Sequence, residues 1–274
     1  MRSLGAPVLG EDTENALTTG KRFDTRGLTA SLCSHIDTLE LGSAAPFGDE
    51  EPVVLATGGF GGSAELVAQY VEPAAPLRLR ANPWSAGDGL RHGLARGAAT
   101  SAGMAEFYGR NMPDTAWGED EFVSAAQLYA PHARIFDEHG VEFFRAEDVS
   151  WSETNVVQAT ARRPGARAYY LLTDAALAEP SVAARIGKTL APDELPFAAP
   201  PGTAAAVRVV AAITHTIGGL RIDDRARVLR ANGTPIDGLF AAGVDAGGIA
   251  AGGYASGLAQ ALVLGLVAAE SVAS

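Results

Sequence analysis

Short apolar runs that end in glycine are the clearest pattern along this chain. Val53–Ala56 leads into a glycine loop and then into Ser63–Tyr70, whose pattern predicts a helix with Ser63 as its N-cap. Gly238–Gly243 is a second such run, followed by a glycine-rich loop and the apolar, alanine-rich segment Leu258–Val272. Because a short apolar run bounded by glycine is typical of a buried parallel strand, we expect two strand–loop–helix units.

Further strands are predicted just before the second unit. Val207–Thr214 is expected to be a strand that enters this region, and Ile217–Ile222 is expected to pair with Arg227–Leu229. Asn232-Gly233 supplies a turn in which a positive φ costs little. Earlier in the chain the pattern predicts two helices, over Gly27–Leu39 and Gly89–Ala99.

The chain changes character between about Gly109 and Gly202. This stretch carries two tryptophans, scattered prolines and a mixture of helix and strand signals, and Phe197–Gly202 punctuates its end. We interpret it as an inserted α+β domain. The segments with such signals are Glu121–Phe136, Val141–Phe144, Glu153–Ala161 and Tyr169–Leu172.

Composition narrows the class of protein. With 274 residues, 47% of them hydrophobic, the chain is long and apolar enough to bury a sizeable core. A net charge of −11 argues against binding to nucleic acid or to an anionic membrane surface. No stretch approaches the ~20 apolar residues of a membrane span. The single cysteine, Cys33, rules out an internal disulfide and favours the cytoplasm.

Three blocks in one order resemble a flavoprotein family. The blocks are Val53–Tyr70, with its Ala-Thr-Gly-Gly, Ser85–Pro113, with Gly-Asp-Gly, and Thr214–Glu270, with Thr-His-Thr-Ile-Gly-Gly and Ala-Ala-Gly. They are similar to blocks of the FAD-dependent family that contains fumarate reductases, succinate dehydrogenase flavoproteins, 3-ketosteroid dehydrogenases and tricarballylate-type dehydrogenases. The resemblance implies FAD as the cofactor and covers about two thirds of the chain.

The resemblance also implies a fold and a domain plan. The fold class is α/β, with an incomplete FAD/NAD(P)-binding Rossmann-like domain and an inserted α+β cap domain that closes over the substrate. We expect residues 1–108 and 207–274 to form the FAD-binding domain and residues 109–206 to form the cap.

The family's N-terminal fingerprint is not found in this sequence. Relatives open with a strand and a G-x-G-x-x-G turn for the pyrophosphate of FAD, and Met1–Cys33 contains neither. Three explanations stay open: a truncated gene or gene start, a partner chain that supplies the dinucleotide-binding half, or a protein that no longer holds FAD.

The resemblance assigns cofactor contacts residue by residue. Asp88 is expected to cap a helix and to meet the adenosine side of FAD, and Asp245 to replace the family's ribityl-binding glutamate, whose own place holds Val244. The amides that begin the last helix would face the electron-rich edge of the flavin. The expected cofactor-binding residues are Ala56, Thr57, Gly58, Gly59, Asp88, His215, Thr216, Gly243, Asp245, Ser256, Gly257 and Leu258.

A second interpretation of the first glycine loop is a nucleotide fingerprint of its own. Gly59-x-Gly61-x-x-Ala64 mimics a dinucleotide-binding turn, and Arg78 and Arg80 stand where an NADP 2′-phosphate would lie. The Ala-Thr-Gly-Gly sequence favours the flavoprotein interpretation. Either interpretation places a tight strand-to-helix turn at this loop.

Candidate substrate-side residues are a histidine, three tyrosines and an arginine. The resemblance places His215 against the flavin and the substrate, and phenols suit enolising ketones as hydrogen-bond donors or proton carriers. The arginines and the second histidine with which fumarate reductases clamp and protonate dicarboxylates are not found at the matching places. The expected catalytic residues are His215, Tyr254, Tyr108, Arg110 and Tyr129, each of which has an ordinary packing or surface role as its alternative.

These observations lead to two functional hypotheses. The first is an FAD-dependent oxidoreductase that moves a hydride between flavin and a C–C bond next to a carbonyl or carboxyl group of a small-molecule substrate. The second is a non-catalytic fragment or subunit that needs a partner chain for the missing half. No metal site is expected in either.

Overall fold

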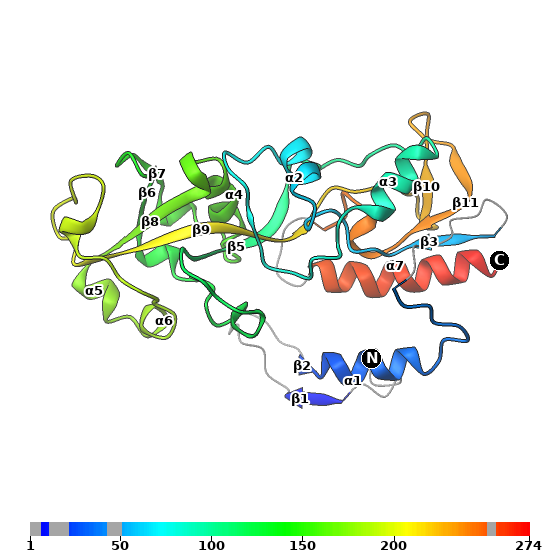
Figure 1. Ribbon diagram of the computed structural model, residues 1–274, viewed down its shortest axis with the longest axis horizontal. Coiled ribbons are helices and arrows are strands. Elements are labelled where there is room, and N and C mark those ends of the chain that lie inside the picture. The colour runs from blue at the N-terminus through cyan, green and yellow to red at the C-terminus, as the bar shows by residue number, and fades with distance from the viewer. Residues whose placement is uncertain (1–6, 11–21, 43–50, 251–255) are drawn as a thin grey trace. The chain divides into compact units, whose positions relative to one another are not determined.

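The computed structural model describes residues 7–10, 22–42, 51–250 and 256–274. The chain divides into two compact units, Met1–Gly48 and Asp49–Ser274. Each unit is described by itself (Figure 1).

The first unit has a strand pair and a helix. β1 (Val8–Gly10) pairs antiparallel with β2 (Arg22–Phe23), and α1 (Thr25–Cys33) follows with Asp24 as its N-cap. The helix expected over Gly27–Leu39 therefore begins earlier and ends at Cys33. The Ser34 hydroxyl donates to the Ser31 carbonyl at 2.7 Å, a local bond that competes with helix continuation.

The small sheet of the second unit contains the parallel strands that the sequence predicts. Its order is β10 (Arg227–Leu229), β11 (Pro235–Ala241) and β3 (Val53–Leu55). β11 and β3 run parallel, whereas β10 and β11 run antiparallel through the turn in which Gly233 has φ 83°. Among the described strands β3 pairs with β11 alone, so its other edge carries no strand.

The pairing expected for Ile217–Ile222 is largely wrong. This segment forms no strand and meets the Arg227–Leu229 strand through one isolated bridge, between Ile222 and Val228. Its backbone is used elsewhere: Gly219 donates to Ser101 Oγ, and Leu220 bonds to the Asp245 carbonyl at 2.7 Å. Gly219 lies close to residues 244–247, and only the end of the segment meets residues 227–229, where Leu229 N–H donates to the Arg221 carbonyl at 2.8 Å.

The large sheet is organised around one long strand, β9 (Ala205–Thr216). The order is β4 (Arg78–Leu79), β9, β8 (Arg167–Leu172), β6 (Arg134–Phe136) and β7 (Glu142–Phe144). β5 (Phe107–Pro113) lies on the other side of β9, antiparallel to it. The strand predicted over Val207–Thr214 is confirmed and extends further at both ends.

Helices border both sheets (Figure 1). Ser63 caps α2 (Ala64–Tyr70) as the sequence predicts, because its Oγ accepts from the Leu66 amide at 3.3 Å. The other helices are α3 (Asp88–Ala95), α4 (Thr154–Ala161), α5 (Asp174–Leu177), α6 (Pro180–Ala183) and α7 (Ser256–Val272). Short 3-10 turns are η2 (Glu119–Glu121), η3 (Ala130–His132), η4 (Ala146–Asp148), η5 (Pro164–Ala166), η6 (Pro192–Glu194) and η7 (Gly243–Asp245).

The expected capping role of Asp88 is wrong. The N-cap of α3 is Gly87, at φ 91°, and Asp88 is already the first helical residue. The helix also stops at Ala95 rather than Ala99, because Gly97 takes the left-handed conformation that ends helices.

Two clusters of buried side chains position the candidate site region. One is packed against the large sheet by α4 and includes Tyr129, Ile135, Val156 and Tyr170. The other joins the end of β11 to α7 through Phe240, Ala242 and Ala268. In the described part of the chain, no helix has the length and apolar character that crossing a membrane requires.

Candidate functional site

Two strand ends bring a histidine and a tyrosine together. Tyr108 and His215 are cross-strand partners in the β5–β9 ladder, and their rings stack with centroids 5.1 Å apart and planes 17° apart. Gly257, at the start of α7, lies against the same imidazole: a Cβ on it would be 2.9 Å from His215 Nε2. The imidazole is thus held between a phenol and the beginning of the last helix, where no larger residue fits.

Hydrogen bonding and burial set the protonation state of His215. Its Nδ1 lies 3.0 Å from the carbonyl oxygen of Thr216, which only accepts, so Nδ1 carries the hydrogen and Nε2 is an acceptor. Burial lowers the pKa of His215, although the bond to Thr216 partly opposes this. At neutral pH the ring is therefore a neutral base whose Nε2 faces the start of α7.

Arg110 is a buried cation next to this pair. Its Nη2 donates to Tyr108 Oη at 2.7 Å, and its guanidinium carbon lies 4.8 Å from the centre of the Tyr108 ring. Its Nη1 donates to the carbonyl oxygens of Gly109, at 3.3 Å, and Ser152. The guanidinium thus links the start of β5 to the segment before α4.

Glu153 is a buried acid near Arg110, and no sequence motif identifies it as a site residue. It precedes α4 with φ 53°, a strained conformation for a residue with a side chain, and Ala130 N–H donates to its Oε2 at 3.3 Å. Burial raises its pKa to about 7, against the opposing effects of that hydrogen bond and of Arg110 and Arg185. Its type and spacing carry no motif, so only the folded chain identifies it.

Tyr129 lies in the core of the 109–206 segment. It is 1% exposed, its Oη donates to Gln127 Oε1 at 2.5 Å, and its ring meets that of Tyr170 edge to face. Burial and the charge of Glu153 raise its pKa. No contact joins its side chain to His215 in the described residues, so any substrate-side role would act through Glu153.

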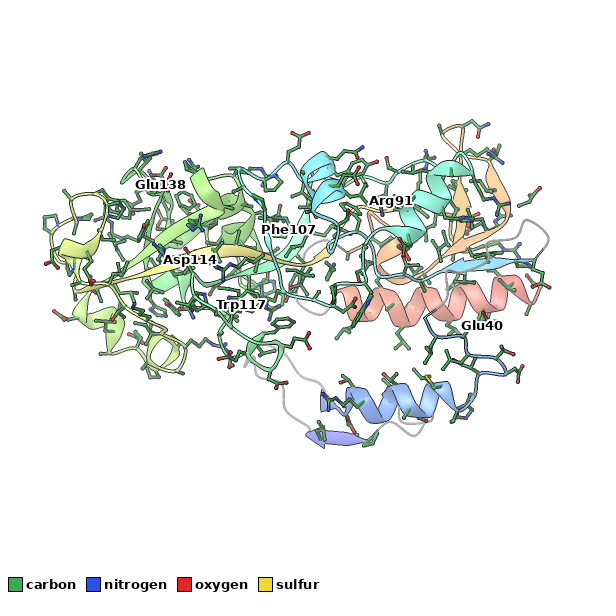
Figure 2. The ribbon with its side chains drawn as sticks, in the orientation of Figure 1. Glu40, Arg91, Phe107, Asp114, Trp117 and Glu138 are labelled. Carbon is green, nitrogen blue, oxygen red and sulfur yellow. The ribbon has the colours of Figure 1, made fainter. Side chains whose placement is uncertain are left out.

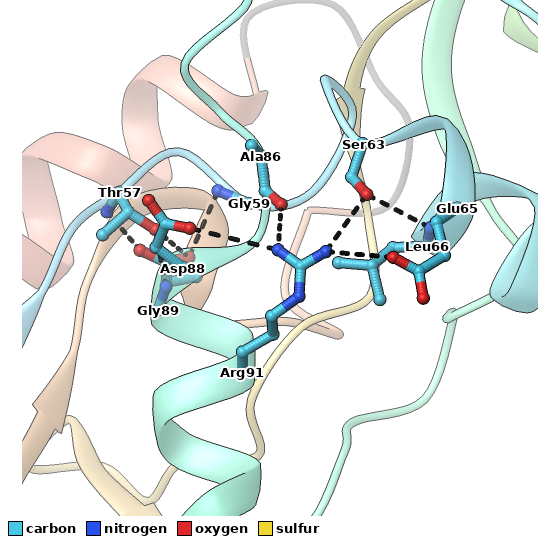
Figure 3. A network of polar contacts seen from close by, with 10 residues as sticks. Thr57, Gly59, Ser63, Glu65, Leu66, Ala86, Asp88, Gly89 and Arg91 are labelled. Atoms are coloured by element: carbon cyan, nitrogen blue, oxygen red, sulfur yellow. Dashed lines mark hydrogen bonds and ion pairs between the residues drawn. The ribbon is translucent and has the colours of Figure 1, made fainter.

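The first glycine loop binds an acid of the chain itself. Asp245 is buried, and its carboxylate accepts from the Thr57 amide, from Thr57 Oγ1 at 3.0 Å and from the Gly59 amide at 3.2 Å. Gly89 N–H donates to Thr57 Oγ1 at 3.1 Å, so the same network reaches the first turn of α3 (Figure 3). Burial raises the pKa of Asp245, and these hydrogen bonds oppose the rise.

Asp88 points away from that network. Its carboxylate lies 3.9 Å from Arg91 Nη1 and is largely exposed, and Arg91 also reaches Glu65 and the Ala86 carbonyl (Figure 3). The arrangement is a solvated ion-pair cluster on the outside of α2 and α3. A contact between Asp88 and a cofactor stays a prediction.

Thr216 is a buried hydroxyl without a hydrogen-bond partner among the described residues. A Cβ on Gly59 would come within 2.7 Å of Thr216 Oγ1 and 2.5 Å of Val244 Cγ1. Valine thus stands, at this crowded point, where the resembling family has a glutamate. An apolar side chain cannot satisfy the Thr216 hydroxyl, which leaves it available to a bound molecule.

The other expected cofactor residues are placed as follows. Gly58 and Gly243 take positive φ values, of 90° and 59°, and Ala56 is exposed at the end of β3. Ser256 and Gly257 begin α7, and Leu258 is 77% exposed. Tyr254 lies outside the described residues.

The donors needed for the NADP interpretation are engaged within the chain. Arg78 bonds to Asp114 and to the Thr115 carbonyl, and Arg80 bonds to the Phe122 carbonyl and Thr214 Oγ1. The loop amides are engaged by Asp245. These contacts count against the NADP interpretation of the loop.

Neither pocket that stands out in the described residues contains the histidine site. One, of about 280 Å³, is apolar and lies between α2, the following loop and Ile213. The other is a shallow groove along β7 and η4. The described residues also contain no group of three or more His, Cys, Asp or Glu side chains placed to hold a metal ion.

Comparison with known proteins gives a family and a fold. The family model described as "FAD binding domain" matches residues 27–258. A search of curated protein sequences finds no match.

Three solved structures share the fold. A flavocytochrome c3 fumarate reductase in an open conformation has 20% identity and a TM-score of 0.61 over 99% of this chain. A 3-ketosteroid delta1-dehydrogenase from Sterolibacterium denitrificans has 18% identity and a TM-score of 0.63 over 97% of this chain. A 3-ketosteroid-delta4-(5alpha)-dehydrogenase from Rhodococcus jostii RHA1 has 20% identity and a TM-score of 0.57 over 82%. This chain spans 61%, 58% and 53% of their respective lengths.

The site geometry fits a flat, polar-edged cofactor. Gly59 and Gly257 let the chain pack against Val244, Thr216 and His215 where any side chain would clash, and Thr216 offers a buried hydroxyl without a partner among the described residues. The start of α7 supplies amides beside the His215 imidazole. These are the features that an isoalloxazine ring with its carbonyl edge requires.

Proposed function

Because the chain belongs to the FAD binding domain family, we propose that it is the substrate-facing part of an FAD-dependent oxidoreductase. FAD is the family's cofactor. The proposed reaction moves a hydride between flavin and a C–C bond next to a carbonyl or carboxyl group. Residues 1–108 and 207–274 would belong to the FAD-binding domain, an incomplete Rossmann-like fold, with residues 109–206 as the cap.

One observation carries this proposal: His215 is held between Tyr108 and the first turn of α7. The ring stack and the contact with Gly257 bring three distant segments to one point. That point combines a neutral base, a phenol bonded to a buried guanidinium and the amides of a helix start. Such a combination suits a ligand that gains or loses a proton next to a carbonyl.

The side chains divide the chemistry among themselves. FAD, when bound, supplies the hydride transfer. Arg110 donates to Tyr108 Oη, which turns the phenol's own hydrogen away from Arg110 and stabilises negative charge on the oxygen after proton transfer. His215 Nε2 accepts a hydrogen bond or a proton from the ligand. The stacked rings also keep water from the space that they occupy.

A direct experiment is to purify the full chain, add FAD and record the visible flavin absorbance after removing free cofactor. Retained flavin supports the proposal, whereas a colourless protein that takes up no FAD removes it for the chain alone. In any preparation that turns over substrate, His215→Gln should reduce kcat by about 10²-fold or more, because general acid–base catalysis contributes ~10²–10⁴-fold. An unchanged kcat would remove His215 from the mechanism.

The second candidate is a subunit or fragment that needs a partner chain for the dinucleotide-binding half. Two surfaces favour it. β3 lacks a second neighbour among the described strands, and α7 exposes Leu258, Leu262 and Leu266 by 77%, 55% and 61%. An open parallel edge beside an apolar helix face is what a missing βαβ unit would cover.

The two candidates separate in one measurement. FAD uptake by the chain alone supports the first, and FAD uptake only after co-expression with a G-x-G-x-x-G-containing chain supports the second. The substrate that we propose for the first candidate is a small molecule, and the compartment that we propose, from the single cysteine, is the cytoplasm.

A further inference from the structure

Arg110 and Glu153 form an unusual electrostatic arrangement next to the histidine site. Both side chains are buried, with residue exposures of 4% and 9%. The hydrogen bonds of Arg110 go to neutral groups, namely the Tyr108 hydroxyl and the carbonyls of Gly109 and Ser152. Glu153, the next residue after Ser152, is the acid that interacts electrostatically with this guanidinium. The buried cation is thus solvated by dipoles and balanced by an acid that it does not contact directly.

The backbone is strained to place this acid. Glu153 sits at φ 53°, where a residue with a side chain costs of order 1–3 kcal/mol. In this conformation it makes no capping bond to the α4 amides and instead accepts from Ala130 N–H at 3.3 Å. Strained residues and buried acids cluster at functional sites, which makes Glu153 a candidate for one.

Several charged and titratable groups face Glu153. Arg110 comes from β5, Arg185 follows α6, Tyr129 precedes η3 and Tyr170 lies on β8. Burial outweighs the two cations and holds the pKa of Glu153 at about 7. Glu153 therefore changes from neutral to negative near neutral pH. Because the two side chains interact electrostatically, this change alters the electrostatic potential at the Arg110 guanidinium.

We propose that Glu153 and Arg110 form a proton-linked charge pair that selects the charge of the ligand bound beside Tyr108 and His215. With Glu153 protonated, Arg110 is an uncompensated buried cation, and the site takes a ligand with a carboxylate or enolate. With Glu153 ionised, the pair is neutral and the preference for an anion is lost. The proton is exchanged with solvent, so anion binding above neutral pH takes up one proton.

This inference rests on the proposed function only for the location of the ligand. The charge pair itself can be measured without FAD and without turnover. Infrared spectra of the full chain, recorded from acidic to alkaline pH, resolve the C=O stretch of a protonated carboxyl. The wild-type spectrum minus that of Glu153→Gln isolates this residue and gives its midpoint.

The first arm tests the coupling between the two side chains. Arg110→Gln should raise the Glu153 midpoint by about one unit, since a nearby opposite charge lowers a carboxyl pKa by 1–3 units. Arg110→Lys keeps the charge and should leave the midpoint near the wild-type value. Arg162 is an exposed cation at the C-cap of α4. Arg162→Gln is therefore the matched control and should leave the Glu153 midpoint unchanged.

The second arm uses a charged probe and its neutral counterpart. Crotonate, in large excess, should raise the Glu153 midpoint, and crotonamide, of the same size, should not. By reciprocity, crotonate binding should weaken about tenfold per pH unit above the midpoint, and this slope should vanish in Glu153→Gln.

The outcomes are decisive in both directions. A Glu153 band that titrates near neutrality and shifts with Arg110→Gln and with crotonate supports the charge pair. A carboxyl that is ionised throughout, or a midpoint that neither change moves, overturns it. Because no flavin is needed, failure here is distinguishable from failure of the FAD proposal.

Discussion

At the scale of single residues, unsatisfied and strained groups separate function from packing. Thr216 keeps a buried hydroxyl without a partner in the described structure, and Glu153 keeps a buried acid at a strained backbone position. Both states cost free energy of folding. By contrast, Asp245 is buried but satisfied by the amides of residues 57 and 59, which marks it as a structural support of the loop.

Thr216→Val should stabilise the ligand-free chain by about 1 kcal/mol, because it removes an unsatisfied buried hydroxyl while keeping the shape. Thr160→Val is the matched control and should destabilise by about 1–3 kcal/mol. Its Oγ1 accepts from Asn111 Nδ2 at 2.9 Å and donates to the Val156 carbonyl at 3.0 Å. Urea unfolding gives both values, and a Thr216→Val variant as unstable as the control would show that the hydroxyl has a partner.

Glu153→Gln should change how stability depends on pH. The pKa of Glu153 is about 7 in the folded chain and 4.5 for an ordinary glutamate, so between these values the folded state holds a proton that the unfolded state has lost. Wild-type stability therefore falls through this window by about 3 kcal/mol and is flat above it. The stability difference between Glu153→Gln and wild type should grow by this amount from pH 4 to pH 8. Parallel pH profiles would contradict the raised pKa.

At the scale of elements, α7 combines one packed face with one uncovered apolar face. Its inner side packs through Leu264, Val267 and Ala268 against the end of β11, while Leu262 and Leu266 are more than half exposed. The sequence predicts this helix from its apolar, proline-free run. It does not predict the open face, because an all-round apolar helix reads as fully buried until its neighbours are known.

Leu262→Glu with Leu266→Glu should reduce self-association of the purified chain and leave its melting temperature nearly unchanged. The physical reason is that both side chains already contact solvent, so little packing is lost. Leu264→Glu, on the packed face, should instead destabilise by about 2 kcal/mol or more. Light scattering and thermal melts measure the two effects. Equal destabilisation by all three changes would mean that the outer face is packed in solution.

In the second unit as a whole, β9 connects the candidate site around His215 to the other strands of the large sheet. It pairs with β4, β5 and β8 and ends at His215 and Thr216. Asp114, just after β5, ties these strands together through Arg78 at 3.1 Å, Arg167 at 2.8 Å and Arg208 at 3.0 Å (Figure 2). One buried carboxylate thus balances three half-exposed guanidinium groups.

Asp114→Asn should destabilise the chain by about 2 kcal/mol, because three arginines then face one another without their shared acid. The loss is smaller than for a fully buried network since water screens half-exposed arginines. Added salt should restore part of it. Glu142→Gln, which breaks the exposed pair with Arg134, is the control and should cost less than about 1 kcal/mol. Equal losses in the two variants would show that Asp114 is not a shared anchor.

Several local elements and the family could be predicted from the amino-acid sequence alone. Ser63 as a cap, the strands that became β3 and β11 and the helix after the glycine-rich loop all follow from short-range patterns, since caps, turns and periodicity depend on neighbours along the chain. The same locality explains two errors: Asp88 stands one residue inside its helix, and most of the 217–222 segment bonds to residues outside the expected partner strand, among them Ser101 and Asp245.

The surroundings of each polar side chain could not be predicted from the sequence, because they depend on tertiary contacts. The stack of Tyr108 on His215, the bonds from the 57–59 loop to Asp245 and the electrostatic interaction of Glu153 with Arg110 each join residues that are far apart in sequence or carry no motif. Burial, strain and protonation depend on the distance to these partners and on the exclusion of water. Both quantities exist only once the chain has folded.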